Sequence, residues 1–463
     1  MKRGVVYLIT VVSLFLYFCA PYGDYWTFNT LTAILFVIEA FIVCESEFKS
    51  KLYVGFNILF SISFFLTSFA FAVLVKGTLA EVFNSILDRL VDFSYLPKCT
   101  SLCLVSYSFY AIGFLNYSKN HRVNSHVSRI DFSINKTQFP HFVFFIAFML
   151  LAIQTLHYIN TVGDINMSES PFLVSIFESL LPVTFVFTLS CKPCTNVNDF
   201  FKKNIFLFSL VSFMMLMYLY MGDRGLVIYC GITIIVVYVL FIKRVKWHTM
   251  LIMGIVGVLM MFVIRMTRGG DESLSSGSIS SFNNAAGSAL AQERGVMYYF
   301  SDLTGAVNEL CVGYEYKKKH GLLEPIDQLA LLPLYPFPLL PTIYTDLLYE
   351  KEPADFGTGE TLNKYASDLG SANFGNHVVI DIYMKWGLIG ILIVFFLFGT
   401  IVSFLYYYKD VSIYYASIYI LFSGFAIYTP RNTIDFLIRP AAYIIFFTWI
   451  FLYSQKSVKI KKG

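Results

Sequence analysis

Charged residues are scarce in this sequence of 463 residues, at 14%, whereas hydrophobic residues make up 57% and the mean hydropathy is +0.65. So few charges cannot cover the surface of a soluble fold, and apolar runs of 18 or more residues recur along the chain. The composition therefore predicts an integral membrane protein with many spans. Because backbone groups in lipid must form their hydrogen bonds internally, we expect an all-α fold rather than open sheets.

Cysteine is also sparse, and most of the eight cysteines lie inside apolar runs, where a thiol behaves as a small hydrophobe. Cys191 and Cys194 form a lone C-x-x-C without a second pair, whereas a structural zinc site needs four ligands. We therefore predict neither a disulfide framework nor a metal site. The net charge of +4 comes from bases scattered among loops, which disfavours nucleic acid as a partner.

The apolar runs predict twelve transmembrane helices, each long enough to cross roughly 30 Å of hydrocarbon at about 1.5 Å per residue. We interpret the first run as a retained helix rather than a cleaved signal peptide, because so many spans follow it. The expected spans are residues 4–20, 27–44, 52–75, 99–117, 140–158, 172–190, 205–221, 225–242, 249–264, 386–407, 413–429 and 441–454.

Basic residues in the short loops give the orientation. The N-terminal Lys2-Arg3 pair, the loop at 243–246 and the tail at 456–462 fall on one side, which the positive-inside rule makes cytoplasmic. The chain then divides into helices 1–9 (1–264), a large outer loop that is partly helical (265–385), and helices 10–12 with a basic cytoplasmic tail (386–463). Prolines concentrate at 324–356 and predict neither a standard helix nor a central strand there.

Arginine is enriched on the outer side, which holds seven of the eleven. Lysine suffices for orientation, whereas a guanidinium holds carboxylate or phosphate through two parallel hydrogen bonds. Arg224 lies in a tight turn between two spans, where a charge is costly unless it faces a polar cavity or a partner. A local pair with Asp223 is the alternative.

Four more arginines stand near helix ends, and snorkelling to lipid headgroups is the competing explanation for all of them. Arg431 and Arg439 flank the loop 430–440, and both share one face with Asp435 if that segment is helical. The other two follow the ninth span: Arg265 and Arg268.

Two short patterns carry a resemblance to a known family. They are the Gly-Asp-Arg-Gly turn at 222–225, and a large loop that ends in Asn376-His377 before a helix containing Trp-Gly-Leu-Ile-Gly at 386–390. Together with the hydropathy of the whole chain, they resemble the Wzy-type O-antigen polymerases and the related O-antigen ligases, which are bacterial inner-membrane glycosyltransferases of the GT-C kind. Similarity at the level of motifs covers 221–226, 374–390 and 430–440.

The resemblance implies transfer of a growing glycan from undecaprenyl diphosphate to the next lipid-linked repeat unit at the periplasmic face, in lipopolysaccharide biosynthesis. It also implies membrane lipid, a chain-length regulator and a flippase as partners, and no cofactor. In the ligases an arginine in a Ser-Arg-Gly turn and a histidine in a His-Asn context carry the chemistry. These roles map onto Arg224 and His377, although Asp223 replaces the serine here and Asn376 precedes the histidine.

The chemistry suits these residues. A departing diphosphate gathers negative charge, which cations stabilise most in the transition state, and the expected diphosphate-binding residues are Arg224, Arg265, Arg268, Arg431 and Arg439. His377 is the expected general base, oriented by Asp381 if the helix begins early enough. A simple polar helix cap is the alternative for His377, and Asp24 is a rival base by analogy with other GT-C enzymes.

Three other classes remain open. A flippase of lipid-linked oligosaccharide would also have many helices, but no internal repeat is visible and one outer loop dominates, which favours an enzyme. A ligase differs only in its acceptor. A membrane scaffold would not need arginines at helix ends.

Overall fold

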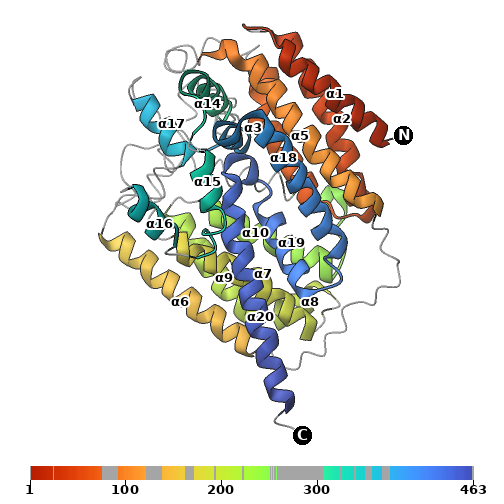
Figure 1. The fold of residues 1–463 in the computed structure, drawn as a ribbon. Helices are drawn as coiled ribbons and strands as arrows, with labels where there is room; N and C mark the ends of the chain where they lie inside the picture. Colours follow the sequence, from red (N-terminus) through yellow and green to blue (C-terminus); the bar gives the residue numbers. More distant parts are fainter. Residues whose placement is uncertain are drawn as a thin grey trace, which may run out of the picture.

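The computed structural model describes residues 2–23, 25–75, 92–120, 138–161, 171–191, 194, 196–221, 224–250, 252, 254, 257, 306–323, 325–337, 340–349, 357–367 and 376–460. Within these ranges the regular structure is entirely helical, as predicted (Figure 1). The α-helices are α1 (Lys2–Cys19), α2 (Trp26–Ser50), α3 (Phe56–Ser68), α5 (Leu96–Asn120), α6 (Gln138–Thr161), α7 (Pro171–Cys191), α8 (Val197–Lys203), α9 (Ile205–Tyr220), α10 (Gly225–Phe241), α14 (Ala306–His320), α15 (Pro325–Leu331), α16 (Leu340–Tyr349), α17 (Thr358–Ser367), α18 (Val378–Tyr408), α19 (Ile413–Phe425) and α20 (Ile438–Ile460). Short turns of other helix types are η1 (Phe71–Val75), η3 (Phe93–Tyr95), η5 (Thr429–Arg431) and η6 (Ile434–Leu437).

Seven of these helices are long and apolar enough to cross a membrane: α1, α2, α5, α6, α7, α18 and α20. The pair α8 and α9 passes the same test as one span bent by 82°, and α3, α10 and α19 are shorter apolar helices. Every predicted span except 249–264 therefore coincides with a helix, and most of 249–264 lies outside the described residues. The chain is thus a helical protein with several membrane-capable helices, and the number twelve stays a prediction.

Close backbone contact joins the N-terminal and C-terminal parts of the chain. α5 packs against α1, α2 and most extensively against α18, and these four helices lie side by side in Figure 1. At the crossing of α5 and α18, a Cβ added to Gly113 would lie 2.0 Å from the carbonyl oxygen of Phe396, and one added to Gly399 would lie 2.0 Å from that of Tyr110. Only glycine allows this approach, which is how helices in lipid gain dispersion contacts.

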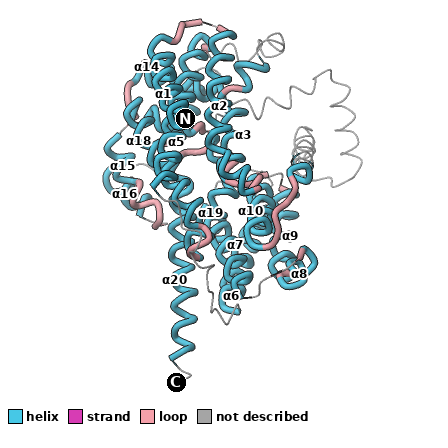
Figure 2. Tube along the Cα trace, turned by 90° about the vertical axis from the view of Figure 1, so that its right-hand side faces the viewer, coloured by secondary structure: helices cyan, strands magenta, loops and turns pink. Residues whose placement is uncertain are grey.

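The region predicted as a large outer loop contributes four helices, α14 to α17. α14 packs against α18 so closely that a Cβ on Gly313 would lie 2.4 Å from Cγ1 of Ile380. The prediction that the proline-rich segment forms no helix is wrong, because α15 starts at Pro325 and α16 has Pro341 in its first turn. Proline fits there because a first-turn N–H needs no partner within the helix. Figure 2 shows α14, α15 and α16 at one side of the bundle, with the C-terminal end of α20 reaching away from them.

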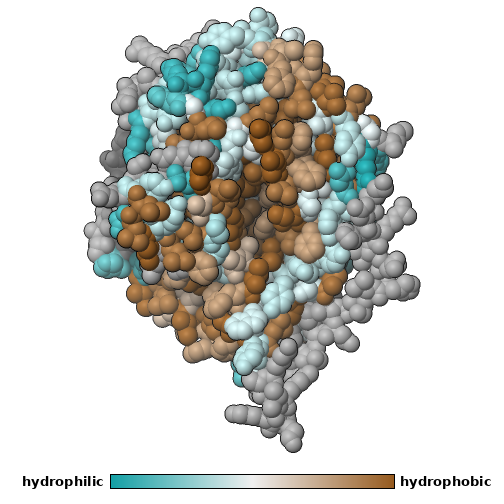
Figure 3. Space-filling model, viewed as in Figure 1, coloured by the Kyte–Doolittle hydropathy of each residue, from teal (hydrophilic) through white to brown (hydrophobic). Residues whose placement is uncertain are grey.

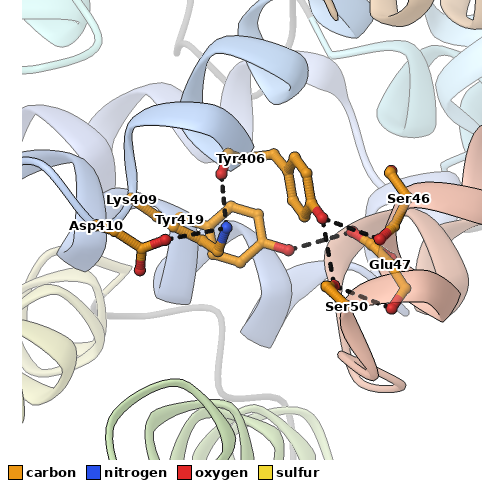
Figure 4. A network of polar contacts seen from close by, with 7 residues as sticks. All are labelled: Ser46, Glu47, Ser50, Tyr406, Lys409, Asp410 and Tyr419. Carbon is orange, nitrogen blue, oxygen red and sulfur yellow. Dashed lines mark hydrogen bonds and ion pairs between the residues drawn. The ribbon is translucent and has the colours of Figure 1, made fainter. Parts of the chain in front are cut away.

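A buried carboxylate joins α2, α3 and α19 at the other end of the bundle. The predicted orientation makes this end cytoplasmic. Glu47 at the end of α2 is fully buried and accepts hydrogen bonds from the backbone N–H groups of Asn57 and Ile58 in the first turn of α3. It also accepts from the Asn57 amide at 2.9 Å and from the Tyr419 hydroxyl at 3.1 Å. Figure 4 shows Glu47 and Tyr419 beside Tyr406 and Lys409, whose ammonium lies 4.1 Å from the centroid of the Tyr406 ring. The eight cysteines are all free, as predicted.

Candidate functional site

The polar stretch before the tenth predicted span is helical. α18 begins at Val378, eight residues before the predicted span 386–407. The helix breaks at Gly387, whose φ of 66° and ψ of −158° are accessible almost only to glycine. Because the break disrupts the hydrogen-bond ladder, the Met384 carbonyl instead accepts from the backbone N–H of Leu323, at 2.9 Å. We call residues 378–386 the polar half-helix.

A buried ion pair lies on the polar half-helix. The Nζ of Lys385 lies 2.8 Å from Oδ1 of Asp381 and 3.8 Å from Oδ1 of Asp435. Asp381 is fully buried and Lys385 is 4% exposed. The hydroxyl of Thr358, at the start of α17, donates to Oδ1 of Asp381 at 2.8 Å, and its oxygen lies 3.0 Å from the side-chain oxygen of Asn376. Two carboxylates share one lysine here, and we call this group the Asp–Lys–Asp cluster.

The segment 430–440 completes the cluster, but not as one helix. It forms the 3-10 turns η5 and η6 before α20 begins, so the condition for a shared face, one helix through the segment, is not met. Arg439 donates from Nε to the Tyr335 carbonyl at 3.1 Å. Burial and the neighbouring charge of Asp435 raise the pKa of the Tyr335 phenol. Tyr335, Asp435 and Arg439 therefore lie together beside Lys385.

Arg431 is a cation of this site that is not paired with another described residue. It is half-buried, and its guanidinium makes neither a hydrogen bond nor an ion pair with the residues described. Its charge is close enough to His377 to help lower the pKa of that imidazole. A planar guanidinium in such a position is ready to bind an oxyanion.

His377 caps α18. Its Nδ1 accepts from the backbone N–H of Val379 at 3.2 Å, and its Nε2 lies 3.2 Å from the hydroxyl of Ser68 at the end of α3. The side chain is fully buried, and burial, followed by the charge of Arg431, lowers its pKa to about 3. A neutral imidazole that accepts at Nδ1 carries its proton on Nε2, which therefore donates to Ser68. This arrangement matches the alternative of a polar cap and leaves His377 no unused lone pair.

The remaining predicted residues divide into two groups. Arg224 stands at the start of α10, and its backbone carbonyl accepts from the Tyr428 hydroxyl at 3.3 Å, which places the turn beside the segment that carries Arg431. The Asp381 carboxylate contacts Thr358 and Lys385, whereas the residue meets His377 only through its backbone N–H, so the structure does not bring the carboxylate to the imidazole. Three predicted residues lie outside the described part of the chain: Asp24, Arg265 and Arg268.

Sequence reasoning did not name Lys385, Thr358 or Tyr335 as site residues. Asp381 and Lys385 have the i, i+4 spacing of a helical ion pair, a signal that becomes readable once the helix starts at Val378. Thr358, Tyr335 and the position of Asp435 come from tertiary packing and have no local signature. In the ranges described, no group of three or more His, Cys, Asp and Glu residues could hold a metal ion.

No protein-family model matches the chain, and no curated protein or solved structure matches it significantly.

Proposed function

We propose that this protein polymerises lipid-linked oligosaccharide repeat units at the periplasmic face of a bacterial inner membrane, as a twelve-helix glycosyltransferase of the GT-C kind with both termini in the cytoplasm. The growing glycan leaves its polyprenyl diphosphate and joins the next lipid-linked unit. The observation that carries the proposal is the guanidinium of Arg431, which is unpaired among the described residues and lies near His377, at the start of the helix that carries the Asp–Lys–Asp cluster.

The arginines suit a diphosphate leaving group. As the bond between the anomeric carbon and the phosphate oxygen breaks, the electron pair stays on the diphosphate, and a fixed cation there stabilises the transition state more than the ground state. Arg431 provides a half-buried fork, and Arg439 is held nearby by the Tyr335 carbonyl. Arg224 approaches the same segment through Tyr428. Arg265 and Arg268 keep the diphosphate-binding role that the resemblance implies.

A carboxylate can take the proton of the attacking hydroxyl. Oδ1 of Asp435 is buried and has no hydrogen-bond partner among the described residues, so it can accept the proton of an acceptor hydroxyl that enters the site. The acceptor oxygen attacks the anomeric carbon, its proton passes to Asp435, and the diphosphate departs. His377 keeps the base role only if an acceptor hydroxyl displaces the Val379 N–H from Nδ1, the nitrogen that carries the lone pair. Asp381 then acts as a positioning residue: it holds Lys385, and Lys385 in turn holds Asp435.

The surroundings suit a substrate that carries a lipid tail. Just beyond the break in α18, Ile389, Ile393, Leu397 and Ile401 recur every four residues and are 49% to 70% exposed. On α15 and α16, Ile326 and Leu347 are 79% and 77% exposed. Figure 3 shows an apolar surface, hollowed near its centre, over the region where these helices meet. Such a surface beside buried charges fits a ligand with a polyprenyl chain and an anionic head.

Reconstitution with purified lipid-linked repeat units tests the proposal. Wild-type protein in liposomes should yield a ladder of polymer lengths, and Arg431→Ala should reduce the rate at least a hundredfold, because one preorganised donor to a developing charge is worth about 10²–10³ in rate. Arg431→Lys, which keeps the charge without the fork, should fall between them.

The other classes give different results in the same assay. A full ladder from Arg431→Ala would refute the site. Transfer of one glycan to a different lipid acceptor without a ladder would indicate a ligase. Movement of the unit across the vesicle membrane without lengthening would indicate a flippase.

A further inference from the structure

Lysines and tyrosines gather on the other side of the polar half-helix. The hydroxyl groups of Tyr17 in α1 and Tyr383 in α18 lie 3.0 Å apart, and the Tyr314 ring of α14 stacks on Tyr383 with centroids 5.6 Å apart. The ammonium of Lys317 lies 3.8 Å from the centroid of the Tyr383 ring, and that of Lys98 lies 4.3 Å from the centroid of the Tyr17 ring. We call these five residues the tyrosine–lysine cluster.

The tyrosine–lysine cluster and the Asp–Lys–Asp cluster lie on opposite faces of one helix. Tyr383 is two residues from Asp381 and two from Lys385. Since an α-helix turns by about 100° per residue, two positions separate side chains by about 200°. The two clusters are therefore separated by little more than the helix itself, whose diameter is about 10 Å.

Ordinary structural roles explain the neighbouring lysines. Lys319 pairs with Glu315 at 2.6 Å and donates to the Tyr365 hydroxyl at 3.1 Å. Lys98 donates to the Tyr17 carbonyl in the last turn of α1. An ammonium carries three N–H donors, so the cap leaves two donors of Lys98 for a ligand.

Lys317 has no such explanation. Its ammonium has no hydrogen-bond acceptor or carboxylate partner in the described part of the chain. It is half-buried, and burial lowers its pKa. It also lies close to the break in α18, 3.7 Å from where a Cβ on Gly387 would be. A partly desolvated cation without an acceptor is unfavourable until an anion arrives.

We propose that Lys98 and Lys317 bind a lipid-borne phosphate group and, resting on the function proposed above, that this group is the diphosphate of the acceptor unit. Polymerisation joins two lipid-linked units, so two diphosphates have to be held at once. Arg431 takes the donor on one face of the polar half-helix, and the tyrosine–lysine cluster takes the acceptor on the other. The tyrosine rings fix the two ammonium groups in place.

Binding of sugar-free polyprenyl diphosphate tests the site independently of catalysis. We would measure it by native mass spectrometry in an Arg431→Ala background, which removes the proposed donor site. Lys317→Gln and Lys98→Gln should each weaken binding about tenfold, the usual worth of one charge-assisted contact. Lys319→Gln is the matched control and should leave binding unchanged, because that lysine is already paired.

The same measurement with phosphatidylglycerol separates the two sources of phosphate. If Lys317→Gln and Lys98→Gln lose binding of phosphatidylglycerol but not of polyprenyl diphosphate, the two lysines form a phosphate site that does not hold the acceptor unit. Unchanged binding of both lipids in Lys317→Gln and Lys98→Gln would overturn the whole proposal.

A two-substrate assay tests the acceptor role. A unit whose acceptor hydroxyl is methylated can only donate, and a unit with a non-cleavable link to its diphosphate can only accept. Lys317→Gln should raise the KM for the accepting unit about tenfold and leave the KM for the donating unit unchanged. Equal effects on both would contradict the assignment. If wild-type protein makes no polymer at all, the proposed function fails, while the binding measurement still decides the phosphate site.

Discussion

Replacing Lys385 by methionine should lower the free energy of unfolding by about 3–5 kcal/mol, because it leaves a buried carboxylate without its cation. Lys385 lies 2.8 Å from Asp381 and 3.8 Å from Asp435, and Asp381 is fully buried. Without the ammonium, Asp381 keeps only the hydrogen bond from Thr358 and faces a second carboxylate.

The reverse change should cost less. In Asp381→Asn, Lys385 keeps Asp435 as a partner and the Thr358 hydroxyl can still donate to the new amide oxygen, so we expect a loss of about 1–2 kcal/mol. The double variant should resemble Asp381→Asn alone, because methionine then strands no buried charge at position 381. The coupling between the two positions is therefore expected to be about 3–5 kcal/mol, the full cost of Lys385→Met alone.

Titration of the purified protein with a denaturing detergent, followed by the loss of helical circular dichroism, measures these differences. Lys203→Met is the matched control: Lys203 also pairs with a carboxylate four residues away at 2.8 Å, that of Asp199, but the two side chains are 36% and 27% exposed. It should have no measurable effect, because water screens an exposed pair. A loss in Lys385→Met as small as that in Lys203→Met would refute the reasoning from burial.

Three more predictions concern other parts of the fold. Burial lowers the pKa of His377 to about 3, so the folded state should lose about 1.4 kcal/mol of stability per pH unit as pH falls from about 6.5 toward 3. His377→Asn keeps a capping oxygen and should flatten this slope, which unfolding titrations at several pH values would measure. Gly387→Ala should cost about 1–3 kcal/mol through backbone strain, whereas Gly231→Ala, with nothing within 4 Å in α10, should not destabilise; equal effects would contradict the strain argument. Glu47→Ala should cost about 3–5 kcal/mol by leaving four donors unpaired, and a thermal midpoint equal to that of wild type would show that the carboxylate is dispensable.

Hydropathy located the helices well, and its errors have a common cause. The start of α18 was placed too late because Asp381 and Lys385 lower the hydropathy of 378–385, although in the fold they neutralise each other. A scale that scores residues one at a time cannot detect a charge that its neighbour cancels. The prolines misled for a related reason, since Pro325 and Pro341 lie in the first turns of helices, where proline is harmless.

The sequence indicated where the candidate site lies along the chain, but not which of its side chains contact one another. The stretch around His377 and the arginines at 431 and 439 do lie near one another. Which group meets which depends on Ser68, Thr358 and Tyr335, which come from distant segments and are chosen by packing. Local sequence therefore suggested a histidine base, whereas the fold uses both nitrogens of His377 to hold the helix start.

The break at Gly387 relates the length of α18 to the position of the site. The 31 residues of α18 would span about 46 Å as one straight helix, well beyond roughly 30 Å of hydrocarbon. The part after the break, residues 388–408, would span about 31 Å and is long enough to cross the hydrocarbon by itself. The polar half-helix is then left over at the membrane surface, where its charges escape most of the cost of lipid burial. The proposed donor site at the Asp–Lys–Asp cluster and the proposed acceptor site at the tyrosine–lysine cluster then lie on opposite faces of this half-helix.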